Sequence, residues 1–230
     1  MANLRQGKFG AYYGSFFNES VALGTSEKET NALYIFSYLT AEGWTPNAIA
    51  GLLGNMEHES ALNPGRWEGN DVGDGPGYGL VQWTPYTNYT NWCADRGYTD
   101  PSEMDNNLAR IIYELENGLQ YYATPGYPLS FREFTQSTDS PYTLACAFAW
   151  NYERSAVVLW GANSYAQAQT LTEAQKEANR EALRQLRGGT AEKWYTYLTG
   201  LTPTPPGGGG SEKAKKKGLS LLLMYMATRK

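Results

Sequence analysis

The stretch GNMEHESALNPGRWEGNDVGDGPGYGLVQWT, residues 54–84, governs how the rest of this chain is interpreted. It starts in an apolar segment that ends with Glu57 and Glu59, and it continues into a loop rich in glycine, proline and carboxylates. Glycine and proline at that density exclude a helix and predict tight turns or a small irregular hairpin. Carboxylates on the two sides of this connection would face one another. Cleavage of a glycosidic bond by a pair of acids requires such an arrangement.

The sequence around this stretch predicts a mostly helical α+β fold. Apolar residues recur at helical spacing after capping residues and before glycines. We therefore expect helices that begin at five points: Ser26, Thr45-Pro46, Ser102, Ser130 and Ser140-Pro141. The first of these helices should have a capping box between Ser26 and Glu29. A charged helix over 172–187 should stop at Gly188-Gly189, and a last helix should follow over 190–200.

The second of these helices carries both glutamates of the opening stretch. Ile49, Leu52, Leu53 and Met56 form one apolar stripe along it. At about 100° per residue, Glu57 and Glu59 lie on opposite flanks, each roughly 80° from the centre of the stripe. Only one of them can face a given cleft, and periodicity does not choose between them.

Length and composition favour one domain of about 200 residues with its own core, followed by a tail. The 18 Tyr, 7 Trp and 7 Phe suit sugar-binding surfaces and a filled core equally. Residues 1–211 contain 13 basic and 22 acidic side chains, net −9, whereas residues 212–230 contain six basic and one acidic, net +5. The acidic body argues against nucleic acid as the main partner.

Cys93 and Cys146 are too few for a disulfide framework or a metal site, so we expect buried free thiols. His58 is the only histidine and has no partners at metal-ligand spacing, which predicts a helix-surface residue and no metal or other cofactor. The N-terminal sequence lacks the features of a secretion signal. If the protein acts on a cell wall, we therefore expect something else to carry it there.

Both ends of the chain differ in character from the body. Residues 1–25 show no helical period and predict an N-terminal arm that packs on the body or on a partner. Residues 202–211, TPTPPGGGGS, predict a linker. Residues 212–230 join a lysine cluster to an apolar run over 219–227, far short of the roughly 20 residues that span a bilayer. We expect a C-terminal tether that docks on another protein, or alternatively on a membrane surface.

Three motifs resemble those of the phage tail lysozyme family. GNMEHESALNP, with Glu59-Ser60, is similar to the start of the catalytic motif, and its Glu-Ser pair also resembles that of goose-type lysozymes and lytic transglycosylases. Residues 77–84, GYGLVQWT, resemble the motif that lines the sugar groove in those families. Residues 148–154, FAWNYER, resemble a late aromatic and Glu-Arg segment. The resemblance implies a lysozyme-like catalytic domain over 26–201, with a small loop lobe.

By this resemblance Glu59, and not Glu57, is the catalytic acid. Cleavage requires a carboxyl group that is still protonated near neutral pH, which burial beside apolar groups favours. A second carboxylate attacks the anomeric carbon, stabilises positive charge or activates water. We expect Asp71 and Asp74 ahead of Glu68, because short side chains near the glycine turn can be aimed into a cleft. Turn capping or solvation is the alternative for each loop acid.

Substrate contacts are expected from both later motifs. Tyr78, Trp83 and Tyr152 have rings that can stack on sugar faces, although a place in the core suits them equally. Gln82 and Asn151 have amides that can bond to acetamido or hydroxyl groups.

The resulting interpretation is a peptidoglycan hydrolase of a phage tail tip or tail interior. It would cleave the N-acetylmuramic acid to N-acetylglucosamine bond of the host wall during genome entry, with further tail proteins bound through residues 212–230. A lytic transglycosylase is expected instead if no acid lies within reach of Glu59, because the 6-hydroxyl of muramic acid can then close the ring. A non-catalytic glycan-binding or structural tail component also fits these motifs, as does a wall-opening enzyme of a conjugative element.

Overall fold

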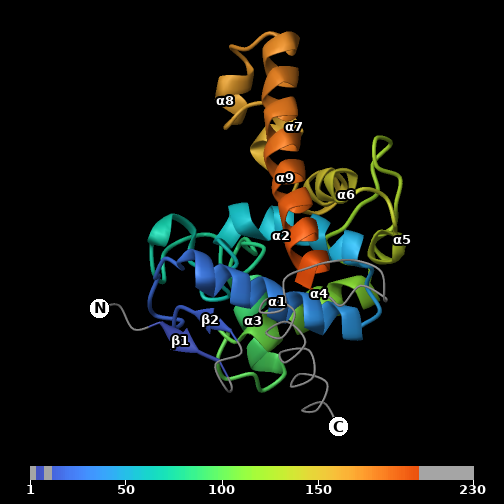
Figure 1. The fold of residues 1–230 in the computed structure, drawn as a ribbon. Coiled ribbons are helices and arrows are strands. Elements are labelled where there is room, and N and C mark those ends of the chain that lie inside the picture. The colour runs from blue at the N-terminus through green and yellow to red at the C-terminus, as the bar shows by residue number, and fades with distance from the viewer. Residues whose placement is uncertain (1–3, 8–11, 202–230) are drawn as a thin grey trace, which may run out of the picture. The chain divides into compact units, whose positions relative to one another are not determined.

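The computed structural model describes residues 4–7 and 12–201, which are mostly helical with one short strand pair (Figure 1). The expected α+β, mostly helical class is confirmed. The described residues form two compact units, one from the described part of residues 4–42 with 56–113 and 197–201, and the other from residues 43–55 and 114–196. The predicted linker at 202–211 and tether at 212–230 lie outside the described residues.

The first unit contains the strand pair and the irregular loop lobe. Strand β1 (Arg5–Gln6) pairs antiparallel with β2 (Tyr13–Gly14), and β2 packs on helix α1 (Thr25–Ala41). Every residue of α1 from 31 to 39 is buried, so this helix forms the centre of the unit's core. The remaining elements are the 3₁₀-helix η2 (Glu68–Asn70), helix α3 (Thr87–Asp95) and most of α4 (Met104–Glu116).

The start of α1 differs from the predicted capping box. The N-cap is Gly24, whose extended backbone (φ −75°, ψ 177°) already suits that position, and no side chain caps the helix. A Cβ on Gly24 would lie 2.6 Å from Oε2 of Glu27, so the acidic side chain that leans back over the helix start is Glu27 and not Glu29. The capping box from Ser26 to Glu29 is therefore wrong.

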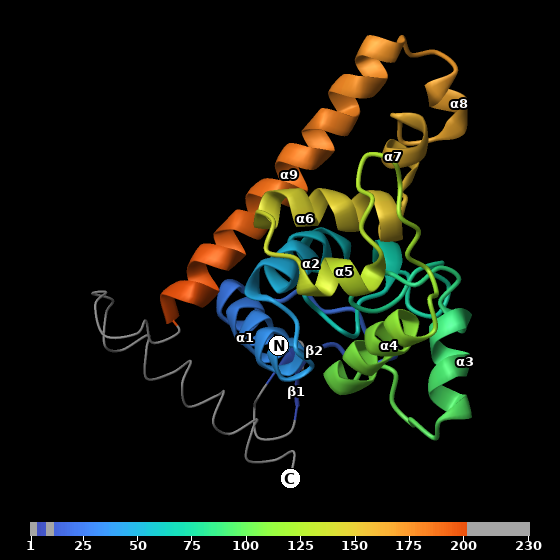
Figure 2. The same cartoon turned by 90° about the vertical axis from the view of Figure 1, so that its right-hand side faces the viewer.

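The second unit consists of helices and loops, with one isolated bridge between Thr124 and Tyr127 and no strand among its described residues. It contains the first turns of α2 (Pro46–Ser60), α5 (Phe131–Gln136), α6 (Pro141–Phe148) and most of α9 (Glu173–Leu201). A π-helix, η3 (Ala149–Glu153), continues α6, and two short helices follow, α7 (Ala156–Trp160) and α8 (Tyr165–Ala168). Figure 2 shows α7 and α8 beside the N-terminal half of α9, where Asn179 donates to the Gly161 carbonyl over 2.8 Å.

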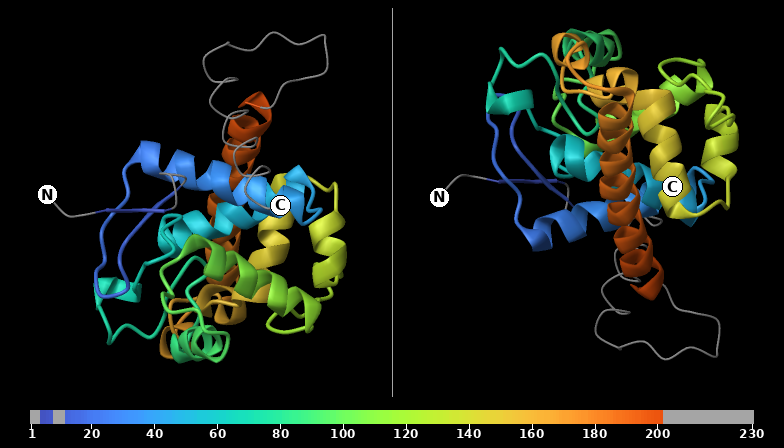
Figure 3. Two further views of the ribbon diagram at one scale, coloured as in Figure 1. Left: turned by 90° about the horizontal axis from the view of Figure 1, so that it is seen from below. Right: turned by 90° about the horizontal axis from the view of Figure 1, so that it is seen from above.

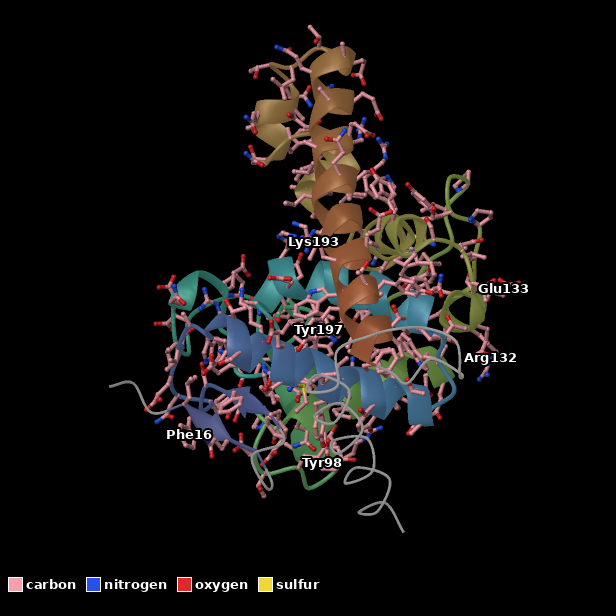
Figure 4. All side chains as sticks on the ribbon, in the orientation of Figure 1. Phe16, Tyr98, Arg132, Glu133, Lys193 and Tyr197 are labelled. Carbon is pink, nitrogen blue, oxygen red and sulfur yellow. The ribbon has the colours of Figure 1, made fainter. Side chains whose placement is uncertain are left out.

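Several predicted helix starts in this unit are confirmed. The Ser130 hydroxyl accepts from the Glu133 amide and the Glu133 carboxylate accepts from the Ser130 amide, which completes the capping box of α5. Arg132 and Glu133, labelled in Figure 4, are both exposed on this short helix. Ser140 caps α6 with Pro141 in its first turn, and the Thr45 hydroxyl accepts from the Ala48 amide at the start of α2.

The predicted helix end at Gly188-Gly189 is wrong, because α9 continues through both glycines to Leu201. Gly188 faces α6, and a Cβ there would lie 2.3 Å from the ring of Tyr142. Gly54 of α2 approaches α9 in a similar way, since its Cβ would lie 2.6 Å from the Arg187 carbonyl. These glycines permit close helix packing, seen from above in Figure 3, and do not end the helix.

Candidate functional site

The end of α2 presents the two glutamates of the opening stretch differently. Met56 is fully buried, whereas Glu57 and Glu59 are each half-buried. Lys28 of α1 forms an ion pair with Glu57, with 3.4 Å between Nζ and Oε1. Glu57 therefore takes part in a contact between α1 and the end of α2, and the expectation that Glu59 is the acid depends on the Glu59-Ser60 motif. His58 is exposed, and no group of three or more metal-binding side chains occurs among the described residues.

Ser60 ties the end of α2 to the glycine-rich motif at residues 77–84. Its buried hydroxyl lies 3.0 Å from the Leu80 carbonyl and 3.0 Å from the Met56 carbonyl of its own helix. The Leu80 amide in turn donates to Oδ1 of Asn107 over 3.0 Å, which anchors the motif to α4. A buried hydrogen bond of this kind costs free energy to lose, because its partners cannot turn to water. The Glu-Ser pair and the motif are thus held together.

The motif forms a small irregular hairpin, which begins inside residues 61–79, where the sequence predicts tight turns or such a hairpin. Tyr78 and Trp83 exchange backbone hydrogen bonds of 3.2 and 3.0 Å, and Tyr78 also forms an isolated bridge with Trp67. Gly79 has φ +85°, and a Cβ there would lie 2.7 Å from Oδ1 of Asn107. Only glycine fits this position without strain.

Gln82 is oriented by the backbone of the same hairpin. Its side-chain nitrogen donates to the Arg66 carbonyl over 3.1 Å and to the Gly79 carbonyl over 2.8 Å. Both amide hydrogens are thereby used within the fold, and Oε1 points toward Gly77, 3.2 Å from where a Cβ would lie. The group that Gln82 can offer to a ligand is therefore a hydrogen-bond acceptor.

The Glu68 side chain reaches the glycine-rich motif. Its Oε2 atom is 2.7 Å from the Cβ position of Gly77, beside Oε1 of Gln82 and Oγ1 of Thr84. Asp71 instead turns back on its own loop, with Oδ2 3.2 Å from the Cβ position of Gly69, and Asp74 is exposed in the same loop. The sequence favours Asp71 and Asp74 over Glu68, whereas Glu68 is the loop acid whose carboxylate is seen to contact the motif at Gly77.

The three candidate stacking rings are buried. Tyr78 is 0%, Trp83 6% and Tyr152 1% exposed. Trp83 stacks on Tyr89 of α3 with ring centroids 4.4 Å apart and planes at 18°. Rings packed in this way fill the core and offer no face to a sugar.

Asn151 and Tyr152 organise the second unit. Asn151 is fully buried, accepts from the Thr124 amide and hydroxyl, and donates to the Tyr121 hydroxyl and the Tyr127 carbonyl. The Tyr152 hydroxyl donates to Oε2 of Glu114 over 2.5 Å, and both residues are about 1% exposed. These contacts give both residues a role in the fold.

Several buried polar residues carry more of this architecture than the sequence indicates. In the sequence they are marked only by being polar residues within apolar helix faces or loops. These residues are Asn31, Asn63, Asn107 and Glu114.

Both cysteines are buried free thiols, as expected. Burial raises the pKa of the Cys146 thiol to about 11. No described helix has the length and apolarity that a bilayer crossing needs.

Comparison with known proteins places these motifs in context. A model of the family described as phage tail lysozyme matches residues 30–198, which include Glu59, Gln82 and Asn151. Morphogenesis protein 1 of Bacillus phage B103 is 46% identical over 142 residues. The aligned segment covers 61% of this chain and 38% of that relative, so the chain spans well under half of the relative's length.

Proposed function

Because this chain belongs to the phage tail lysozyme family, we propose that it is a peptidoglycan hydrolase that cleaves the bond between N-acetylmuramic acid and N-acetylglucosamine. The observation that carries the proposal is the family match over residues 30–198. The bond from Ser60 to Leu80, which joins the Glu-Ser pair to the glycine-rich motif, supports it.

In the proposed mechanism Glu59 is the general acid. It would donate its proton to the departing glycosidic oxygen, a role that general acids perform with rate gains of about 10² to 10⁴. A second carboxylate would then attack the anomeric carbon, stabilise its positive charge or activate water. We favour Glu68 for this role over Asp71 and Asp74, and the closeness of its carboxylate to Gly77 of the motif supports that choice.

Gln82 supplies the proposed substrate contact in the first unit. Since its amide hydrogens bond to the backbone, its Oε1 atom would accept from an acetamido N–H or a sugar hydroxyl. Asn151 contributes through the loop that it holds, because its own donors and acceptors are used inside the second unit.

The test is zymography on purified cell walls with a matched pair of variants. Glu59→Gln should lower clearing by at least about 100-fold, because it removes the acidic proton and keeps the size of the side chain. Glu57→Gln, two residues away and paired with Lys28, should clear like wild type. The proposal fails if wild type clears nothing, or if Glu59→Gln clears as well as Glu57→Gln. Wall binding without clearing would indicate a glycan-binding or structural tail component.

The released fragments separate hydrolysis from transglycosylation. Mass spectrometry should find reducing muramic acid ends if water completes the reaction. Anhydromuramic ends would instead indicate that the muramic 6-hydroxyl closes the ring, without need of Glu68 as a nucleophile.

For the biological setting, we propose action on the host wall during genome entry, as a component of a phage tail tip or tail interior. The basic and apolar composition of residues 212–230 supports a tether to further tail proteins. A chain that ends at Thr202 should keep activity on isolated walls and fail to join particles. Its normal incorporation would exclude the tether.

A further inference from the structure

A segment near the N-terminus, outside the family match, packs on the loop that carries Glu68. We call residues 12–23 the N-terminal strap and residues 61–79 the carboxylate loop. The match to the phage tail lysozyme family begins at residue 30, after the strap. Tyr12, Ser15 and Leu23 of the strap are all buried, so the strap is part of the first unit's core.

Asn63 makes the first connection between the strap and the carboxylate loop. Its Oδ1 atom accepts from the Ser15 amide over 3.0 Å, and its side-chain nitrogen donates to the Ser15 hydroxyl and the Val21 carbonyl, each over 2.8 Å. Asn63 is 1% exposed, so these bonds are protected from water. One side chain thus binds two points of the strap.

The two backbones also approach unusually closely. A Cβ on Gly65 would lie 2.1 Å from the Ser15 carbonyl oxygen, which only glycine tolerates. Gly14 of the strap faces Pro64 of the loop, with its Cβ position 3.1 Å from the proline ring.

The third connection flanks Glu68 on both sides. The indole nitrogen of Trp67 donates to the Phe17 carbonyl over 2.6 Å, and the Phe17 ring packs on Trp67 and Tyr78 with centroids 5.3 and 5.1 Å away. Beyond Glu68, the Ser20 hydroxyl bonds to Oδ1 of Asn70 over 3.1 Å. The strap therefore holds the residue before Glu68 and a residue two positions after it.

We propose that the N-terminal strap is a positioning element for Glu68 in the proposed glycan-cleaving site. Its hydrogen bonds to the loop lie on both sides of Glu68, at residues 63, 67 and 70, so Glu68 is the loop acid whose backbone the strap holds. This inference rests on the proposed function for its catalytic consequence, but not for the physical coupling of strap and loop.

The first arm of the test measures that coupling without any activity. Phe17→Ala removes the ring that packs on Trp67, and Phe16→Ala, at a neighbouring position 40% exposed to solvent, is the matched control. Hydrogen exchange followed by mass spectrometry should show faster exchange over residues 66–79 in Phe17→Ala, by about tenfold, and an unchanged helix α6. Wild-type exchange in the loop would overturn the inference, whatever the activity.

The second arm uses kinetics on soluble peptidoglycan strands, normalised to the folded fraction. Phe17→Ala should lower kcat by about tenfold with little change in KM, because misplacement of a reacting group slows chemistry more than binding. Phe17→Tyr, which keeps the ring, should restore kcat. Combined with Glu68→Gln, Phe17→Ala should cost nothing further, since both act through one carboxylate.

The outcomes separate this inference from the proposed function. Additive losses in the double variant would show that the strap acts through general stability, and would overturn the positioning role. Full activity of Glu68→Gln would also overturn the positioning role. Full activity of Glu59→Gln would refute the proposed function, and the exchange arm would still decide whether the strap holds the loop.

Discussion

The hydroxyl of Ser60 and the carbonyl of Leu80 lie 3.0 Å apart in the buried part of the first unit. Ser60 follows the proposed acid Glu59 directly, and Leu80 is the central apolar residue of the glycine-rich motif. This hydrogen bond therefore connects the end of α2 to the hairpin that orients Gln82.

We predict that Ser60→Ala lowers both stability and wall-clearing activity. The change leaves the Leu80 carbonyl without this donor in a buried place, which should cost about 1–3 kcal/mol in the free energy of unfolding. Urea unfolding and zymography measure the two effects. Ser37→Ala is the control, because the Ser37 hydroxyl is also buried but donates only within its own helix, to the Leu33 carbonyl. Equal losses in the two variants would contradict a special role for the bond to Leu80.

We predict that Gly77→Ala lowers activity with little loss of stability. The new Cβ would lie 2.7 Å from Oε2 of Glu68, and the carboxylate is the mobile end of an exposed side chain that can swing away. Clearing assays and thermal unfolding should therefore respond differently. Gly126→Ala is the matched control, since a Cβ there meets nothing within 4 Å. If Gly77→Ala retains full activity, the position of the Glu68 carboxylate does not matter.

The sequence predicts elements whose causes are local. The capping box at Ser130 and Glu133 and the Ser140-Pro141 start of α6 depend on atoms within one helical turn, so the pattern alone is sufficient. The tight turns over residues 61–79 follow from their glycines and prolines in the same way.

What the sequence misses depends on contacts between distant residues. The sequence pattern at Gly188 predicts a helix end, but glycine is needed there because the ring of Tyr142, from another helix, lies where a side chain would be. Glu68 ranks below Asp71 by side-chain length, whereas the fold brings its carboxylate to Gly77. Asn107 shows no motif, yet it holds the Leu80 amide. Such partners are not visible in a local pattern.

We predict that the second unit loses stability as the pH rises above about 9. Burial raises the pKa of Cys146 from 9.0 to about 11 and that of Tyr121 from 10.0 to about 12. As the pH rises, the unfolded chain therefore releases these protons before the folded chain does. The stability that the two protonated groups give the fold is complete below pH 9 and is lost as the pH rises toward about 12. Urea midpoints measured between about pH 8 and 11 should fall, and Cys146→Ala should make the first part of that decline shallower. A midpoint that stays constant from pH 9 to about 11 would contradict the prediction.

We predict opposite effects from alanine at the two adjacent glycines of α9. Gly188→Ala would place a Cβ 2.3 Å from the ring of Tyr142, so the helices must separate, at a cost of about 1–3 kcal/mol. At Gly189 a Cβ meets nothing within 4 Å, and alanine there should stabilise the helix by about 0.5–1 kcal/mol through its better propensity. Thermal and urea unfolding of both variants measure the difference. Both positions lie in one turn of one helix, so helix propensity alone would change the free energy of unfolding equally in the two variants. Equal changes would therefore show that close packing on Tyr142 does not explain the glycine at position 188.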